Sequence, residues 1–179
     1  MRITMISRSL CEKAERIKLV AFDVDGVLTD GRLYFSADGD EMKAFNILDG
    51  LGIKMLMNSG IEVAIITGRR SPLTERRISD LGIRHLMQGR EDKLVALKEL
   101  TGKLAVDLKQ VAYIGDDLPD LSAIRAAALG ITVANGHRFV KQHADWCTEA
   151  SGGTGVAREV ADFILDSQGL LTRIHESYL

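Results

Sequence analysis

The chain has 179 residues, enough for one domain with a sizeable hydrophobic core. Hydrophobic residues make up 46% of it and charged residues 27%, as in ordinary globular proteins. A net charge of −2 and an aromatic content of 5% argue against a nucleic-acid partner, which would need a basic face or base-stacking side chains.

The cysteines and the apolar runs indicate the compartment. Cys11 and Cys147 have neither CxxC spacing nor a histidine cluster nearby, so we expect free thiols in a reducing cytosol rather than a zinc site or a disulfide. The N-terminal residues lack the apolar run of a signal peptide, and no apolar run reaches the roughly 18 residues that span a membrane. The sequence therefore predicts a cytoplasmic protein without a membrane partner.

Short apolar segments alternate with helical patterns along most of the chain. A short polar helix is expected at 7–16. Strands are expected at 19–24, 63–67, 84–87, 111–115 and 130–134, and a further short strand is considered at 146–148. Helices are expected at 50–58, 71–81, 92–100, 117–127 and 155–167. This order indicates a doubly wound α/β fold, in which helices cover both faces of a parallel sheet, and we expect a single domain over 1–179.

Residues 31–49 break this alternation. The segments RLYFS and EMKAFNI flank the turn-rich ADGD, which predicts a β-hairpin turning at Asp38-Gly39. A hairpin directly after the first strand would overhang the carboxyl edge of the sheet, where doubly wound folds bind ligands. It is therefore a candidate flap over a site, with an ordinary surface hairpin as the alternative. A Gly-rich segment, SGGTG, begins the C-terminal tail at about 151.

Polar residues follow four of the predicted strands. They are Asp23 and Asp25 after the first strand, Thr67 at the end of the second, Lys93 after the third, and Asp116, Asp117 and Asp120 after the fourth. Each signal alone has an ordinary structural explanation, such as a solvated turn or a helix cap. Because the carboxyl ends of parallel strands share one edge, however, we expect these side chains to converge.

The residue types at this edge suit one kind of chemistry. Carboxylates from two loops make an all-oxygen site that fits Mg²⁺ better than zinc or copper. Lys93 supplies a positive charge for phosphate, and Thr67 with nearby backbone N–H groups can donate hydrogen bonds to phosphate oxygens. Two acids, a hydroxyl, a lysine and a metal together indicate phosphoryl transfer.

The motifs DVDGVLTDG, ITGR, a helix-opening lysine and GDDLPD, in this order, resemble the haloacid dehalogenase superfamily of phosphatases over about 18–135. FNILDG at 45–50, the GLGIKML helix and GGTGVARE at 152–159 further resemble the 3-deoxy-D-manno-octulosonate 8-phosphate (KDO 8-phosphate) phosphatases of lipopolysaccharide biosynthesis, over nearly the whole chain. The resemblance implies Mg²⁺-dependent hydrolysis of that sugar-acid phosphate through an aspartyl-phosphate.

The resemblance also implies a role for each motif residue. Asp23 would be the nucleophile, and Asp25 would protonate the leaving sugar oxygen and then activate water. Thr67, Gly68 and Lys93 would hold the transferring phosphate. Asp116 would complete the Mg²⁺ site with Asp23 and the Asp25 backbone carbonyl, while Asp117 or Asp120 would lie behind these ligands.

Substrate recognition and assembly are expected from the same resemblance. Arg69 and Arg77 are candidates to bind the carboxylate of the sugar acid, and the Gly-rich tail would bring Arg158 near an active site. A solvated helix position is the alternative for Arg158. The family is tetrameric, and a neighbouring subunit helps to close each site.

Three alternatives remain open on the sequence. The same catalysis with another substrate, such as a nine-carbon keto-sugar acid 9-phosphate, is the nearest. A response-regulator receiver module also combines acids, a threonine and a lysine, but its phosphoacceptor follows a middle strand and its lysine comes last. A non-catalytic relative is disfavoured because every motif residue is present.

Overall fold

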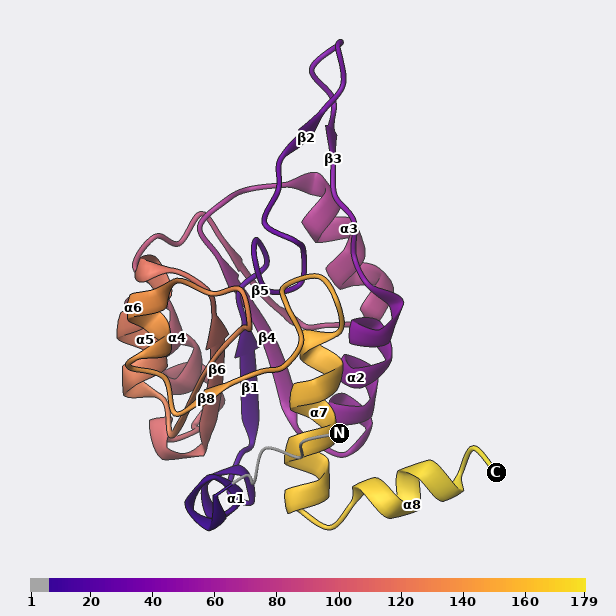
Figure 1. The fold of residues 1–179 in the computed structure, drawn as a ribbon, viewed down its shortest axis with the longest axis vertical. Helices are drawn as coiled ribbons and strands as arrows, with labels where there is room; N and C mark the ends of the chain where they lie inside the picture. Colours follow the sequence, from indigo (N-terminus) through magenta and orange to yellow (C-terminus); the bar gives the residue numbers. More distant parts are fainter. Residues whose placement is uncertain (1–6) are drawn as a thin grey trace.

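The computed structural model describes residues 7–179, and its centre is a six-stranded parallel sheet (Figure 1). Its strands are β1 (Leu19–Phe22), β4 (Glu62–Thr67), β5 (His85–Gln88), β6 (Val111–Gly115), β7 (Leu129–Thr132) and β8 (Trp146–Cys147). Their order across the sheet is β5-β4-β1-β6-β7-β8, so β1 lies inside, between β4 and β6. The predicted doubly wound parallel sheet is confirmed.

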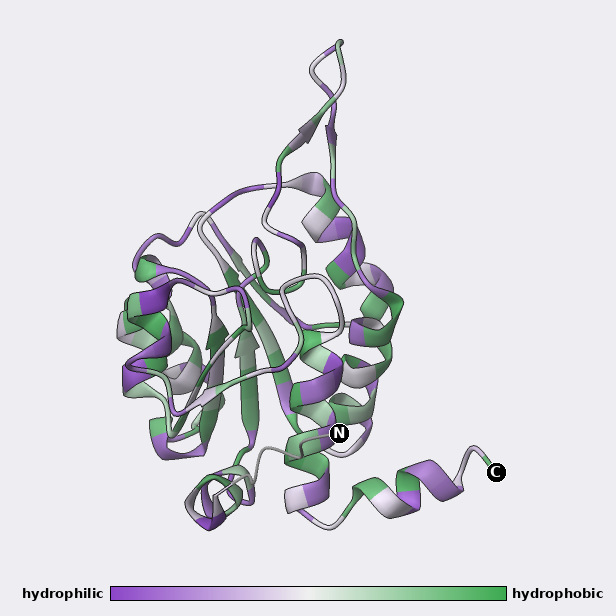
Figure 2. Cartoon of the chain, viewed as in Figure 1, coloured by the Kyte–Doolittle hydropathy of each residue, from purple (hydrophilic) through white to green (hydrophobic). Residues whose placement is uncertain are grey.

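Helices cover both faces of this sheet. One face packs against α1 (Arg8–Ala14), α2 (Ile47–Asn58), α3 (Pro72–Leu81) and α7 (Val156–Ser167). The other packs against α4 (Lys93–Leu104), α5 (Leu121–Ala126) and the short α6 (Arg138–Lys141). Figure 2 shows hydrophobic strands between helices that carry both hydrophobic and hydrophilic residues.

Strand β1 shows why its sequence is continuously apolar. Val20 and Phe22 belong to the core on the α2 and α7 side, and Leu19 and Ala21 belong to the core on the α4 side. All four residues are completely buried. A strand with two covered faces has no solvent side on which to place polar residues, so LVAF is followed by polar residues only where the strand ends.

The predicted hairpin is present and projects from the carboxyl end of the sheet (Figure 1). Its strands, β2 (Tyr34–Phe35) and β3 (Glu41–Met42), pair antiparallel, with Tyr34 opposite Met42. The turn closes with a 2.9 Å hydrogen bond from Ser36 N to Asp40 O, and Gly39 has a left-handed φ of +88° that favours glycine.

Several boundaries differ from the sequence-based expectation. Strand β1 ends at Phe22 because the backbone turns at once, with Leu28 N donating to Val24 O. Helix α2 begins three residues early because the Asn46 side chain caps it, accepting from Leu48 N. The expected helix at 117–127 divides into a 3₁₀ turn, η2 (Leu118–Asp120), and α5.

Three short elements were not predicted: η1 (Leu108–Gln110), α6 and α8 (Leu171–Glu176). Each is between 3 and 6 residues long, too short for a clear 3.6-residue period. No helix formed within residues 7–179 is both long and apolar enough to cross a bilayer.

Candidate active site

Asp23 lies at the carboxyl end of β1 and faces the other predicted site residues. Its backbone N–H donates to Ile114 O at 2.9 Å, which extends the pairing of β1 with β6 by one residue. Its Oδ1 accepts a 2.7 Å hydrogen bond from Val24 N. The residue is only 8% exposed, so its carboxylate is held in place on the edge of the core.

Lys93 reaches this carboxylate from the first turn of α4. Its Nζ lies 2.9 Å from Oδ1 of Asp23 and 3.1 Å from Oδ1 of Asp120, and it donates to Ile66 O at 3.0 Å. The three donors of the ammonium are therefore all used. Burial disfavours the charge, but the two carboxylates outweigh it and raise the pKa of Lys93, so the side chain stays cationic.

Asp120 positions Lys93 and the loop after β6. Its Oδ1 also accepts from the Tyr113 hydroxyl at 2.9 Å, and its Oδ2 accepts from the backbone N–H groups of Asp116 and Asp117 at 3.2 and 3.4 Å. Asp117 is exposed and caps the following turn through Leu118 N. The two aspartates that the sequence left undivided thus have different roles.

Asp116 completes a carboxylate cluster that fits a divalent cation. One oxygen each of Asp23, Asp116 and Asp120 lies within 4.8 Å of the others. The Asp120 oxygens already accept four hydrogen bonds, so Asp23 and Asp116 are the side chains better placed to bind a metal. These are hard oxygen ligands, the kind that Mg²⁺ takes.

Gly26 lets Asp116 approach the loop that carries Asp25. A Cβ at this position would lie 2.1 Å from Oδ2 of Asp116, and the φ of Gly26 is +91°. Only glycine fits both conditions. The Asp116 carboxylate therefore lies directly against the backbone beside Asp25, whose carbonyl the family resemblance implies as a metal ligand.

The charge of this cluster is not balanced by Lys93 alone. Burial, with the Asp120 charge second, raises the pKa of Asp23 to about 6. Burial, followed by Asp120 and Asp23, raises the pKa of Asp116 to about 7. Repulsion of this kind is relieved when a cation binds between the carboxylates.

Asp25 is not part of the cluster around Lys93. It forms an ion pair with Lys43, which directly follows β3 of the hairpin. The Lys43 side chain is 3% exposed, compared with 22% for Asp25. Lys43 was not among the predicted site residues, although the segment EMKAF places charged residues two apart, on one side of an extended strand.

The ITGR motif supplies the other side of the site. Thr67, the last residue of β4, is 2% exposed, and a Cβ on Gly68 would meet no atom within 4 Å. Arg69 Nη2 lies 2.8 Å from Oε1 of Glu41 on the hairpin. Its buried Nη1 has no hydrogen-bond partner among the described residues, which leaves a donor for a ligand.

The two remaining arginines have partners within the chain. Arg77 Nη2 donates to Asn46 O at 3.1 Å, and its guanidinium lies 5.9 Å from the centre of the Phe45 ring. Arg158 Nε donates to both Asp162 oxygens at 2.9 Å on the same helix. Among the described residues its guanidinium pairs with Asp162 and not with the Asp23 cluster, so the structure does not bring Arg158 together with the other predicted residues.

The Gly-rich segment packs on the loop after Asp23 of its own chain. Gly153 N donates to Val27 O at 2.9 Å, and Gly152 N donates to the Asn135 side chain at 2.8 Å. A Cβ on Gly152 would lie 1.9 Å from the Gly26 carbonyl oxygen. The glycines at this segment therefore allow close backbone contact with the Asp25 loop.

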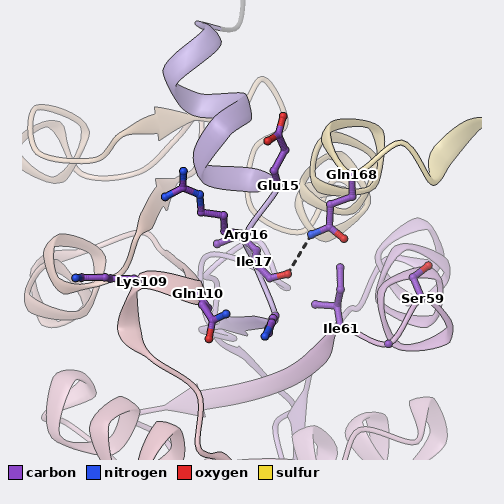
Figure 3. Close-up of a pocket in the computed structure, with 10 residues that line it drawn as sticks. Glu15, Arg16, Ile17, Ser59, Ile61, Lys109, Gln110 and Gln168 are labelled. Atoms are coloured by element: carbon purple, nitrogen blue, oxygen red, sulfur yellow. Dashed lines mark hydrogen bonds between the residues drawn. The ribbon is translucent and has the colours of Figure 1, made fainter.

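A cavity with a volume of about 570 Å³ lies at the opposite edge of the sheet (Figure 3). Among its lining residues, Lys18, Ile61 and Gln110 directly precede β1, β4 and β6. The Gln168 side chain lies in the lining of this cavity, where its Nε2 donates to the Ile17 carbonyl at 3.0 Å. The cavity is therefore separated from the carboxylates by the length of the strands.

Comparison with known proteins agrees with this geometry. Residues 79–160 match the family model of haloacid dehalogenase-like hydrolases. The chain is 47% identical to the 3-deoxy-D-manno-octulosonate 8-phosphate phosphatase KdsC of Escherichia coli K12 over 166 residues, which cover 93% of this chain and 88% of the relative.

Solved structures give the same result. The phosphatase of that name from Moraxella catarrhalis, in complex with magnesium, phosphate and KDO, superposes with a TM-score of 0.95 at 46% identity and covers 97% of this chain and 100% of its own. A probable YrbI family phosphatase from Pseudomonas syringae pv. phaseolica has a TM-score of 0.94 at 56% identity, with 96% and 98% covered. The chain therefore belongs to the haloacid dehalogenase-like hydrolases, in the family of the 3-deoxy-D-manno-octulosonate 8-phosphate phosphatases.

Proposed function

We propose that this protein is a Mg²⁺-dependent phosphatase that hydrolyses KDO 8-phosphate to KDO and phosphate, a step of lipopolysaccharide biosynthesis. The observation that carries the proposal is the contact of Asp23 with Lys93 beside Asp116, with a second acid, Asp25, two residues further along. A nucleophilic carboxylate, a fixed cation and a separate acid are the parts that a two-step phosphoryl transfer needs.

The proposed first step is an attack on the substrate phosphorus. Asp23 attacks through its carboxylate while Lys93 and Thr67 hold the phosphate oxygens, and the bond from phosphorus to the sugar oxygen breaks. Asp25 gives its proton to that oxygen, which leaves as the C8 hydroxyl of the product. In the second step Asp25, now a carboxylate, takes a proton from the water that hydrolyses the aspartyl-phosphate.

Bound Mg²⁺ would neutralise charge shared by the carboxylates and the transferring phosphate. Asp23, Asp116 and the Asp25 carbonyl would hold it, in keeping with the raised pKa of the two side chains. Gly68 would offer its backbone to the phosphate, and Arg69 and Arg77 would bind the sugar carboxylate. The free Nη1 of Arg69 supports its share of that role.

A phosphate-release assay tests the proposal. A panel of sugar phosphates, including KDO 8-phosphate and a nine-carbon keto-sugar acid 9-phosphate, is assayed with Mg²⁺ and again with chelator. We expect turnover to be fastest with KDO 8-phosphate and to stop with chelator. Asp23→Asn should lower kcat by about 10³-fold or more while the circular dichroism spectrum stays unchanged. Preference for the nine-carbon substrate would assign the protein to the alternative.

We further propose that the protein is a homotetramer in which a neighbouring subunit completes each site. The hairpin supports this, because Leu33, Phe35 and Met42 are 52%, 60% and 58% exposed. Large apolar side chains gathered on a projecting hairpin are typical of a docking surface. Light scattering on the protein and on Phe35→Asp tests it, since a tetramer should dissociate in the variant.

The proposed compartment is the cytoplasm. Cys11 and Cys147 are both free thiols within the described chain, and free thiols persist in a reducing compartment. Fractionation of cells that produce the protein would test the assignment.

A further inference from the structure

Lys43 is a buried cation that the proposed mechanism does not yet use. Its side chain is 3% exposed and pairs with Asp25. A lysine is rarely buried so completely unless its charge is matched, and this one is matched by the carboxylate proposed to handle protons. The pairing therefore places a residue of the hairpin in direct contact with the chemistry.

The burial pattern of the hairpin explains why the Lys43 side chain points toward Asp25. From 41 to 45 the residues alternate between partly buried and exposed, with Glu41, Lys43 and Phe45 turned inward and Met42 and Ala44 turned outward. Glu41 contacts Arg69, and its Oε2 accepts from the Ser71 hydroxyl at 3.4 Å. Side chains two apart on an extended strand point the same way, so the contact of Glu41 and the contact of Lys43 fix one face of the hairpin against the site.

Asp25 is held by one oxygen only. The Lys43 ammonium donates to its Oδ1, while Oδ2 accepts no hydrogen bond from any described residue. One fixed oxygen and one free oxygen orient a carboxyl group without occupying the atom that would meet a leaving group. Lys93 cannot take over this role, because Asp23, Asp120 and Ile66 use its three donors.

We propose that Lys43 is the positioning residue for Asp25, holding Oδ1 so that Oδ2 delivers its proton to the leaving oxygen. This rests on the proposed function. In the step described above, the proton leaves Asp25 Oδ2 as the phosphorus–oxygen bond breaks, and Asp25 becomes a carboxylate. The Lys43 ammonium then lies beside the negative charge that Asp25 has gained, which favours the transfer.

The leaving group provides a readout that a purely structural role would not change. Departure of a sugar alkoxide needs a proton, whereas p-nitrophenolate leaves without one. The value of kcat/KM covers the steps up to this departure, so it isolates the proton-donating step from the later hydrolysis. Three substrates are needed: KDO 8-phosphate, glycerol phosphate, which has a poor leaving group but no carboxylate, and p-nitrophenyl phosphate.

For Lys43→Met we expect kcat/KM to fall on the order of 10²-fold with both poor-leaving-group substrates and to change little with p-nitrophenyl phosphate. Lys43→Arg should restore part of the loss, because it returns a cation to the same side. The matched control is Lys54→Met, which removes an exposed lysine from α2 and should behave as the parent protein with all three substrates. If Lys43→Met does not fold, Lys43→Arg is compared with the parent protein instead. Its cation is displaced, so its smaller loss of kcat/KM should again be confined to the two poor-leaving-group substrates.

Two results overturn the proposal. Equal losses with all three substrates would mean that Lys43 binds the phosphate, and a loss confined to KDO 8-phosphate would mean that it binds the sugar carboxylate. Asp25→Asn distinguishes an error in the role of Lys43 from an error in the proposed function. If that variant shows the leaving-group dependence and Lys43→Met does not, only the role of Lys43 is wrong. If Asp25→Asn lacks the dependence, the proposed acid itself is wrong.

Discussion

Nζ of Lys93 lies 3.1 Å from Oδ1 of Asp120, and each side chain is only 2% exposed. Asp120 accepts three further hydrogen bonds, from Tyr113 and from two backbone N–H groups of the loop that carries Asp116. One carboxylate thus connects the cation of α4, the strand β6 and the proposed metal loop. Its contribution is to the geometry of the site rather than to contact with substrate.

Removing this carboxylate should be costly. Asp120→Ala leaves Lys93 with one counter-charge and Tyr113 without its acceptor, so we expect the free energy of unfolding to fall by about 3 kcal/mol. Urea denaturation of the protein in chelator measures it. The control is Glu12→Ala, which removes an ion pair with a 93% exposed Arg8 and should leave the unfolding midpoint almost unchanged. Similar midpoints for the two variants would contradict the role given to Asp120.

Gly26 offers a test of the metal site that does not alter any ligand. In Gly26→Ala the new Cβ would meet Oδ2 of Asp116 at 2.1 Å, so the carboxylate must move and Mg²⁺ affinity should fall at least about 10-fold. Calorimetric titration of Mg²⁺ into the protein measures the change. Gly39→Ala is the matched control, because its φ of +88° imposes the same backbone strain with no atom within 4 Å. An equal loss of affinity in both variants would show that backbone strain, and not the contact with Asp116, weakens Mg²⁺ binding.

The raised pKa values predict how pH changes stability without metal. The folded-state pKa of Asp116 is about 7 and that of Asp23 about 6, both above the ordinary aspartate pKa of 3.8 that the unfolded chain keeps. Between pH 3.8 and about pH 7 the folded protein still holds protons on these two carboxyl groups, whereas the unfolded chain has released them. The free energy of unfolding therefore falls as pH rises through this range. We expect the Tm in chelator to fall from about pH 4.5 to about pH 8, and the Tm gain from Mg²⁺ to grow over the same range.

Asp116→Asn provides the control for this pH dependence. The variant lacks the more strongly shifted carboxyl group, so the decrease in Tm towards high pH should be shallower in chelator. Thermal unfolding curves of both proteins across the pH range make the comparison. A slope that is unchanged in the variant would show that other groups control the dependence.

The parallel-sheet pattern was sufficient to predict which ends of which strands meet. Asp23, Lys93 and Asp116 come from segments separated by many residues, yet the shared edge of parallel strands predicts their convergence. The hairpin was also predictable, since its turn residues are local signals. What a local pattern cannot predict is where a hairpin lies against the rest of the molecule, so Lys43 and its contact with Asp25 were missed.

The ion pair of Arg158, in contrast, was predictable from a local pattern but was not predicted. Asp162 lies four residues later on the same helix, a spacing that brings opposite charges together, and the ion pair could have been predicted from the sequence alone. The family resemblance instead implied a substrate-binding role for Arg158. The roles of Asp117 and Asp120 needed the structure, because burial of one and exposure of the other depend on how the turn after β6 packs.

Arg69 gives the last prediction, on substrate recognition. Its Nη2 is held by Glu41, and its Nη1 is buried without a partner in the described chain, so one donor of the guanidinium remains unused for a carboxylate. In Arg69→Met we expect KM for KDO 8-phosphate to rise about 10- to 100-fold, because a charge-assisted hydrogen bond is lost. The KM for p-nitrophenyl phosphate should change little, because that substrate has no carboxylate. The control is Arg70→Met, since Arg70 is exposed and packs over Gly89 instead. Equal increases in KM for both substrates would assign Arg69 to the phosphate rather than to the sugar acid.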